Sequence, residues 1–457
     1  MERAVKGFAV FDCDAHINDP LRIWDYVPAS ERELVRATYW RNESEAWLNG
    51  ATRVNGGGSR GYAAAGMFNP ICIAGPQMSK KIIRRLLSMV PLDDAQRDYL
   101  EHKGASDPHA RVRDLDLMGI DQVLVIPTKV IEHLPYAENP LGAAAFCRAY
   151  NDFAADWCGA VPERLFPAAL LPVQSPEHAA REVRRVAERG FRVGLVRPID
   201  AQGLYPNDLG AAAAGLQPGA SRTSFDALFR AFEETGLVLG MHAFPASRPH
   251  RTAGPGLLAS PGELLLHAGV DSQTLSFVFE SQVWLAQVLL SGFLDRYPRL
   301  RMAIFESNSQ WLPALLEHCD RLFQLYARER RFPASRLPSE AFDAQCVISF
   351  EGDEEPTLRQ WRRFQEIGIW SSDAYHHDAA DAWGALAAMQ RLGVPAPVQE
   401  KLLGGNARRA YGIEPKLFVR EEPGPIERPA WFPQGPELEA WAEREARRPA
   451  PREARPL

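Results

Sequence analysis

Eight short apolar segments rich in β-branched and aromatic residues recur along the 457-residue chain. The stretches between them carry apolar residues at spacings of three and four, which is typical of amphipathic helices, and two of these stretches end at a glycine. The eight expected strands cover residues 7–11, 122–127, 165–172, 192–198, 237–243, 300–306, 346–351 and 367–373. Eight strands alternating with helices predict an α/β fold, a (βα)8 barrel of the TIM type, rather than a doubly wound sheet. No glycine-rich phosphate-binding motif follows any strand, which argues against a nucleotide site.

Three regions exceed what such a barrel needs. We expect one barrel domain over residues 1–413, with a long insertion at about 20–109 that follows the first strand and lies over the barrel mouth, and a surface loop at 202–221. Residues 414–457 are rich in proline, arginine and glutamate, which predicts an extended C-terminal arm with a short helix near 437–448. Aromatic side chains in this arm need an apolar surface to cover them. We therefore expect a homo-oligomer, most simply a dimer, with a hetero-oligomer containing a paralogue as the alternative.

Net charge, apolar run lengths and cysteine spacing limit the kinds of partner and the cellular compartment to be expected. A net charge of -6 argues against nucleic acid, because binding to phosphates needs a basic surface. No apolar stretch approaches the length of a membrane span, and the first apolar run is too short for a signal peptide. The six cysteines lack paired zinc-ligand spacing, so we interpret them as reduced thiols of a cytoplasmic protein. A small-molecule substrate remains the expected partner.

Polar side chains gather at the carboxyl ends of the expected strands. They are Asp14 and His16 after the first strand, His242 at the end of the fifth, Glu306 at the end of the sixth, and Asp373, His376 and His377 at and after the eighth. Active sites of (βα)8 barrels lie on this face. Two histidines and two carboxylates that meet there would suit a divalent ion, and neutral imidazole is a ligand for zinc, manganese or iron.

Each of these residues also has a structural interpretation. His16 and His242 could be buried, hydrogen-bonded histidines beneath a barrel loop. Asp14 could cap the segment that follows it, and Asp373 could cap the helix after the eighth strand rather than act as a ligand or general base. Asp12 is expected to hold the loop after the first strand.

Three further residues leave alternatives open. Arg197 ends the fourth strand, where it could bind a substrate carboxylate bidentately or pair with an acid such as Asp200. His376 and His377 could lie on a surface loop, or one of them could orient a carboxylate of the site.

The chain resembles a known family in seven stretches whose order and spacing match it: DCDAHINDP, DLMGIDQVLVIPT, ERLFPAALLPVQSPEHAAREV, GLVLGMHAF, GFLDRYPRLRMAIFESNSQWLPALLEHCDR, SSDAYHH and KLLGGNARRAYGI. It is similar to the amidohydrolase-related family of the amidohydrolase superfamily, metal-dependent barrels that include aromatic-acid and semialdehyde decarboxylases. The resemblance extends to Ile413. It implies an enzyme whose metal ligands are Asp14, His16, His242 and Asp373.

Two departures from the family pattern affect the chemistry. The first ligand position holds Asp14 in place of the first histidine of the commoner His-x-His motif, and this exchange favours a harder metal ion. Many members have a histidine and a run of glycines after the sixth strand, whereas this chain has FESNSQW. Glu306 of this stretch could be a ligand, a proton shuttle or an acceptor for backbone amides.

The expected ligands serve two reactions equally well. A metal-bound hydroxide would hydrolyse an amide, ester or lactone, with Asp373 accepting the proton of the water. Alternatively, the metal would hold a substrate carboxylate and an adjacent oxygen for non-oxidative decarboxylation, with an acid delivering a proton to carbon. We favour this carbon–carbon lyase reaction, with Asp373, Glu306 and His376 as catalytic groups. His377 is expected to orient one of these groups, and Arg197 is expected to bind the substrate.

The cofactor expected for either reaction is one divalent ion, zinc, manganese or iron. A second metal bound by Glu306 and His376 or His377 would instead give a dinuclear iron or manganese site able to activate oxygen. A non-catalytic barrel that serves as a structural subunit for an active paralogue is the remaining alternative.

Overall fold

A computed structural model describes residues 3–17, 21–37, 103–128, 130–131, 134, 137, 139–197, 225–243, 272–330, 334–375 and 379–424. Its strands are β1 (Phe11–Ile17), β2 (Gln122–Pro127), β3 (Leu165–Leu170), β4 (Val193–Val196), β5 (Val238–His242), β6 (Arg301–Phe305), β7 (Cys346–Phe350) and β8 (Gly368–Trp370). They form one sheet in the order β1-β2-β3-β4-β5-β6-β7-β8, and each strand runs parallel to the next. The prediction of a (βα)8 barrel is confirmed.

The barrel closes between the end of β1 and the segment that follows β8. The Asp373 amide donates to the Asp14 carbonyl over 3.1 Å, and the His16 amide donates to the Ala374 carbonyl over 3.0 Å. The backbone hydrogen bonds that close the barrel therefore involve Asp14, His16 and Asp373, three of the residues that were expected to bind metal. They bring the first and the last of these residues together although the two are more than 350 residues apart in the chain.

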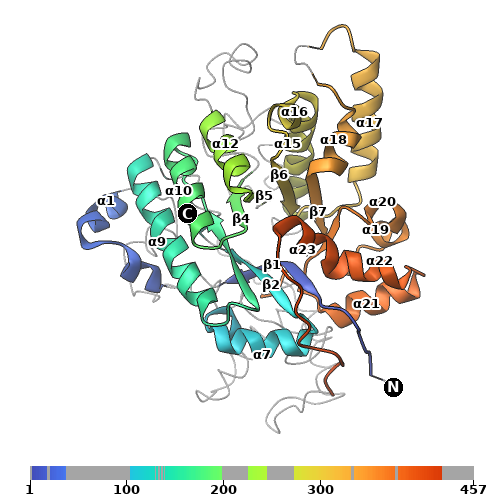
Figure 1. The fold of residues 1–457 in the computed structure, drawn as a ribbon, viewed down its shortest axis with the longest axis horizontal. Coiled ribbons are helices and arrows are strands. Elements are labelled where there is room, and N and C mark those ends of the chain that lie inside the picture. Colours follow the sequence, from blue (N-terminus) through green and yellow to red (C-terminus); the bar gives the residue numbers. More distant parts are fainter. Residues whose placement is uncertain are drawn as a thin grey trace, which may run out of the picture.

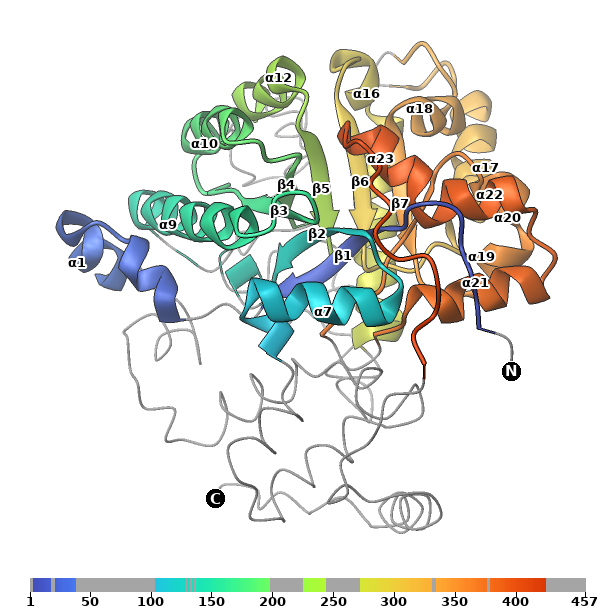
Figure 2. The same cartoon turned by 60° about the horizontal axis from the view of Figure 1, so that its bottom comes forward.

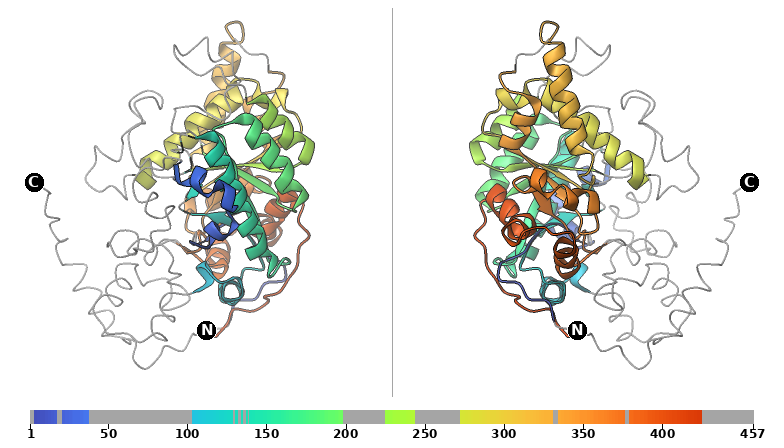
Figure 3. Two further views of the ribbon diagram at one scale, coloured as in Figure 1. Left: turned by 90° about the vertical axis from the view of Figure 1, so that its left-hand side faces the viewer. Right: turned by 90° about the vertical axis from the view of Figure 1, so that its right-hand side faces the viewer.

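Helices surround the strands, as Figures 1 and 2 show. The longer helices are α7 (Pro108–Met118), α9 (Pro140–Gly159), α10 (Pro176–Glu188), α12 (Asp226–Thr235), α15 (Val278–Leu290), α17 (Leu312–Leu325), α18 (Pro338–Gln345) and α21 (Ala382–Arg391). Shorter helical pieces are η1 (Leu21–Tyr26), η2 (Ala29–Glu31), α1 (Arg32–Ala37), η3 (Lys103–Ala105), η5 (Ser272–Phe277), α16 (Phe293–Arg296), α19 (Glu355–Arg359), α20 (Trp361–Phe364), α22 (Ala396–Glu400), η6 (Lys401–Gly405) and α23 (Asn406–Tyr411). The side views in Figure 3 show α9 and α10 on one side of the barrel and the orange helices α19–α22 on the other.

Local sequence explains where several helices begin. Asp107, Asn139 and Ser175 each accept hydrogen bonds from backbone amides of the following helix, and each is followed by a proline at the first helical position. A polar cap satisfies amides that have no partner within the helix, and proline lacks the amide that would otherwise need one. Helix α7 ends at Gly119, whose φ of 74° is readily adopted only by glycine.

The first strand differs from the expectation. Residues 7–11 were expected to be extended, but β1 covers Phe11–Ile17 and so contains the polar residues that were expected to follow it. All seven of its residues are buried. Polar side chains are tolerated here because each finds a partner across the barrel, and those partners lie too far away in the chain for a local pattern to reveal them.

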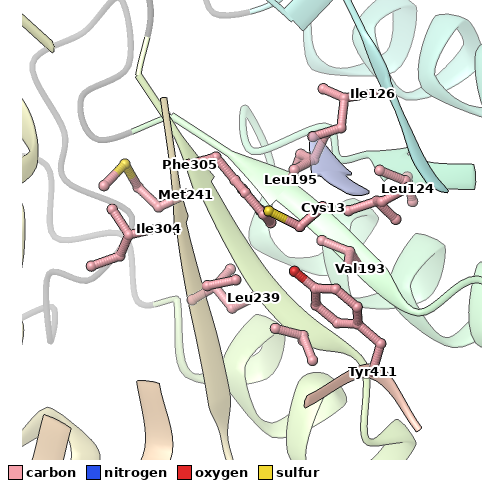
Figure 4. Packing of buried hydrophobic residues seen from close by; sticks show 14 of the residues in the cluster. Cys13, Leu124, Ile126, Val193, Leu195, Leu239, Met241, Ile304, Phe305 and Tyr411 are labelled. Carbon is pink, nitrogen blue, oxygen red and sulfur yellow. The ribbon is translucent and has the colours of Figure 1, made fainter. Parts of the chain in front are cut away.

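Buried side chains of β1, β2, β4, β5 and β6 belong to one hydrophobic core cluster, which also includes Tyr411 of α23 (Figure 4). Cys13 is part of this core, and the other cysteines of the described residues are likewise free and buried. Burial raises the pKa of the Cys319 thiol to about 11. Burial raises the pKa of the other described thiols as well, so all of them are protonated at neutral pH.

Most of the expected insertion, the loop at 202–221 and residues 425–457 of the expected arm lie outside the described residues. The first part of the arm runs along its own barrel. The amides of Phe418 and Val419 donate to Asp121 Oδ1 over 2.6 and 2.8 Å, and the Glu422 amide donates to the Ala4 carbonyl. The covering of the mouth by the insertion and the homo-oligomer remain predictions. Among the described helices, none has the length and apolar character needed to cross a bilayer.

Candidate metal centre

Asp14, His16 and His242 form a compact buried cluster at the carboxyl ends of β1 and β5. His16 Nε2 lies 3.3 Å from Asp14 Oδ1, and His242 Nε2 lies 3.3 Å from Asp14 Oδ2. One ligand atom from each residue falls within 4.8 Å of the others. The two imidazole rings stand nearly perpendicular, at 89°, with their centroids 5.4 Å apart. The structure therefore brings three of the four expected ligands together.

Asp373 completes the cluster from the segment after β8. Its Oδ1 lies 3.3 Å from His16 Nε2, and its side chain is 4% exposed. The backbone of Asp373 has a φ of 49°, in the left-handed region that non-glycine residues rarely adopt. Among the described residues, the other non-glycine positions with positive φ are Glu306, Asn308 and Tyr375, all just beyond β6 or β8. Such conformations persist only where surrounding contacts impose them, and they gather at functional sites.

The charges of the cluster depend on one another. Burial lowers the pKa of His16, but the carboxylates of Asp14 and Asp373 outweigh this effect and raise that pKa to about 10. Burial raises the pKa of Asp14, yet His242 and His16 bring it below its ordinary value. A positive charge between the carboxylates of Asp14 and Asp373 is therefore favourable, and a proton on His16 supplies it when no metal is bound.

The cluster fits a divalent cation on its own chemistry. Asp14 Oδ1 is buried and lacks a hydrogen bond of acceptable geometry among the described residues, although it lies close to His16 Nε2. A cation would satisfy this oxygen and replace the proton on His16. Two imidazole nitrogens with two carboxylates are a donor set suited to zinc, manganese or iron.

The Glu306 carboxylate lies near Nδ1 of His242, the ring nitrogen that does not face Asp14. Its Oε2 is 3.4 Å from His242 Nδ1, which also lies 2.7 Å from the Ala243 carbonyl oxygen. A hydrogen on Nδ1 would bond to that carbonyl and leave the Nε2 lone pair available to a cation held between His242 and Asp14. Glu306 Oε2 therefore lies near Nδ1, whereas Asp14 lies near Nε2 of the same ring.

The Asp12 carboxylate accepts hydrogen bonds from backbone amides and from a serine hydroxyl. Its Oδ1 accepts from the amides of Asp14 and Ser372 over 3.1 and 3.0 Å, and its Oδ2 accepts from the Ser372 hydroxyl over 2.5 Å. Asp12 therefore ties β1 to the segment after β8, in agreement with its expected structural role. His376 and His377 lie outside the described residues, so their roles remain predictions.

Arg197 follows β4 and pairs with an acid that the sequence analysis missed. Its Nη2 lies 3.9 Å from Glu280 Oε2 on α15, and both side chains are buried. The alternative partner, Asp200, lies outside the described residues. A signal for Glu280 exists in hindsight, because it is the single charged residue of α15, VFESQVWLAQVLL. A lone charge on a buried apolar helix requires a partner.

Glu280 gives a pH-dependent prediction. Burial raises the pKa of Glu280 to about 7 against the pull of Arg197, from an ordinary value of 4.5. The folded chain thus holds this proton more tightly than the unfolded chain, and stability falls as pH rises from about 4.5 through 7. Relative to wild type, Glu280→Gln should gain up to roughly 3 kcal/mol in unfolding free energy between pH 5 and pH 8. Urea unfolding at both pH values measures this gain, and a difference that does not change with pH would contradict it.

A (βα)8 barrel with imidazoles and carboxylates gathered at the carboxyl ends of its strands has the architecture of the metal-dependent barrel enzymes. Comparison with known families makes the assignment narrower. The family model described as Amidohydrolase matches residues 136–413. The chain therefore belongs to the amidohydrolase family, as the resemblance implied.

Curated relatives of this chain are decarboxylases. Gamma-resorcylate decarboxylase of Rhizobium radiobacter is 23% identical over 256 residues, which cover 56% of this chain and 71% of the relative. The enzyme of the same name from Rhodococcus jostii is 24% identical over 261 residues, 56% of this chain and 72% of the relative.

Solved structures show the same fold at lower identity. An amidohydrolase from Mycobacterium avium subsp. paratuberculosis has a TM-score of 0.61 and 17% identity, and the match covers 89% of this chain and all of the other (100%). The 5-carboxyvanillate decarboxylase of Novosphingobium aromaticivorans, solved with bound manganese, has a TM-score of 0.58 and 18% identity, with 89% and 97% of the two chains covered.

Proposed function

We propose that this chain is a metal-dependent lyase that removes the carboxyl group of a small aromatic acid without oxidation. The buried cluster of Asp14, His16, His242 and Asp373 is the observation that carries the proposal. The relatives named gamma-resorcylate decarboxylase support the reaction type. A neighbouring structure holds 2,6-dihydroxybenzoate, in which hydroxyl groups flank the carboxylate, so we propose a carboxylate beside a hydroxyl as the substrate class.

The proposed metal is a single divalent ion held by Asp14, His16, His242 and Asp373. When bound, it would polarise a substrate carboxylate and an adjacent oxygen. Manganese is the first ion to test, because neighbouring decarboxylases were solved with it; zinc and iron remain alternatives. Among the described residues, Asp14, His16 and His242 are the only three metal-ligating side chains that lie close enough together to share an ion. A dinuclear oxygenase site would need residues that the structure does not describe.

Decarboxylation exchanges a carbon–carbon bond for a carbon–hydrogen bond, so a proton must reach the carbon atom. Asp373 is our choice for the group that carries it, because its carboxylate faces His16 at the mouth of the barrel. Glu306 would hold the orientation of His242 from the Nδ1 side. Arg197, held by Glu280, would bind an anionic oxygen of the substrate. His376 remains a second proposed proton donor, and His377 a residue that orients it.

Hydrolysis of an amide, ester or lactone is the competing proposal, favoured by the description of the family model. One experiment separates the two. Manganese-loaded protein in deuterated water should release carbon dioxide from 2,6-dihydroxybenzoate or related hydroxybenzoates and leave one deuterium on the ring. Turnover of amides, esters or lactones without any carbon dioxide release from such acids would overturn the lyase proposal.

A further inference from the structure

Arg111 on α7 is a fully buried cation that lies beside the metal cluster rather than in it. Its Nε donates to the Gly104 carbonyl over 2.6 Å, and its Nη2 donates to the His16 carbonyl over 2.5 Å. Its Nη1 has no hydrogen-bond partner among the described residues. Burial of a charge is costly, so the contacts of this guanidinium with two backbone carbonyls require an explanation.

Aromatic rings enclose the same guanidinium. Its carbon lies 4.2 Å from the ring centroid of Tyr375 and 5.3 Å from that of Trp157. The Tyr375 hydroxyl donates to Asp114 Oδ2 over 2.6 Å. Asp114 is three residues after Arg111 on α7, so the two side chains project from the same face of that helix. Helix α7 thus holds Tyr375 both by its ring and by its hydroxyl.

Tyr375 lies two residues after Asp373, in a segment whose backbone conformation is unusual. The φ angles of Asp373 and Tyr375 are 49° and 75°, so two non-glycine residues in the left-handed region flank Ala374. The Ala374 carbonyl in turn accepts the His16 amide. Because side chains oppose this backbone conformation, outside contacts must maintain it. The contacts of Tyr375 with Arg111 and Asp114 are of the kind required.

The segment at Gly104 reaches the same cluster. A Cβ atom at Gly104 would lie 2.2 Å from the Tyr375 hydroxyl oxygen and 2.3 Å from Asp114 Oδ2, so no side chain fits there. This residue belongs to η3, the short helical turn that precedes α7. One guanidinium therefore connects three pieces of backbone: the end of β1, the stacked loop after β8 and η3.

We propose that Arg111 is a positioning residue for the metal centre. Its hydrogen bond to the His16 carbonyl and its stacking on Tyr375 hold the two ligand-bearing segments in register, so that the Asp373 carboxylate faces His16. The inference rests on the proposed function, because it assumes that the cluster binds a divalent ion. It adds a residue outside that cluster which sets the affinity of the site for metal.

The test compares two Arg→Lys variants. In Arg111→Lys the cation is kept, but an ammonium cannot donate along two fixed directions while it stacks between rings. Arg164→Lys is a matched control, because Arg164 is also buried, donates to the carbonyls of Asp121 and Ile120 over 2.7 Å each, and stacks on Phe418 at 4.7 Å. These contacts lie at the amino ends of β2 and β3, at the opposite end of the barrel from the cluster.

Manganese affinity, measured by titration of the metal-free protein in full length, is the readout. We expect the dissociation constant for manganese to rise at least about tenfold in Arg111→Lys and to stay within about twofold of wild type in Arg164→Lys. In Arg111→Lys, kcat should fall by a larger factor than the factor by which KM changes. If Arg111→Lys does not fold, Tyr375→Phe removes only the hydroxyl bonded to Asp114 and should still weaken manganese binding. Equal affinities in wild type, Arg111→Lys and Tyr375→Phe would overturn the inference. Failure of wild type itself to bind manganese, zinc or iron would overturn the proposed function and the inference with it.

Discussion

Asp373→Asn is expected to lower kcat by a factor of roughly 10²–10⁴, the range for loss of a general acid or base. Asparagine keeps the shape of aspartate but has neither its negative charge nor its basicity. The carboxylate that faces His16 over 3.3 Å would be lost, while the left-handed backbone at this position is one that asparagine tolerates. The fold should therefore survive, and the effect should appear in turnover.

Steady-state rates of manganese-loaded protein, with metal content determined on the same sample, measure this effect. Asp381→Asn is the matched control. Asp381 caps α21 by accepting the Gly384 amide, and asparagine is an equally good cap, so kcat should stay close to wild type. Wild-type turnover by metal-loaded Asp373→Asn would show that Asp373 has no part in proton transfer.

His16→Ala and His242→Ala are expected to weaken divalent metal binding by more than about 100-fold, the upper range for disturbing groups around a metal. Both imidazoles face Asp14 at 3.3 Å, so removal of either one takes away a ligand and leaves fewer donors than an ion needs. The apolar packing of the barrel does not depend on these two side chains. Far-ultraviolet circular dichroism of the metal-free variants should therefore match wild type.

Metal content after dialysis, followed by titration with manganese, measures the loss. His178→Ala serves as the control, since His178 lies at the start of α10, outside the cluster. It should bind metal as wild type does. Stoichiometric metal in both His16→Ala and His242→Ala would return these residues to their structural interpretation as buried, hydrogen-bonded histidines.

For some strands the bounds predicted from the sequence match the structure to the residue, and for others they are shifted. Strand β2, Gln122–Pro127, matches the expected range because a continuous apolar run is typical of a parallel strand covered on both faces. Strand β1 was displaced because its polar residues are paired with Ser372 and Ala374, which no local pattern can reveal. The expected metal ligands did come together, since the ends of parallel strands meet on one face of a barrel.

The supporting residues were beyond sequence reasoning. Glu280 is 83 positions from Arg197, and Arg111 reaches His16 across 95 positions through a main-chain oxygen, which no residue type signals. Glu306 was noticed for its position after β6. Its place on the Nδ1 side of His242 depends on a ring orientation that only the three-dimensional structure defines. The residue types thus predict which polar groups gather at the strand ends, but not the groups that hold them in place.

The central claim is that Asp14, His16, His242 and Asp373 hold a single divalent ion. Anomalous X-ray scattering from crystals of manganese-loaded wild-type protein, recorded at the manganese absorption edge, tests it directly. We expect one peak per chain, in contact with the side chains of these four residues. No peak at saturating manganese, or a peak bound to other residues, would contradict it.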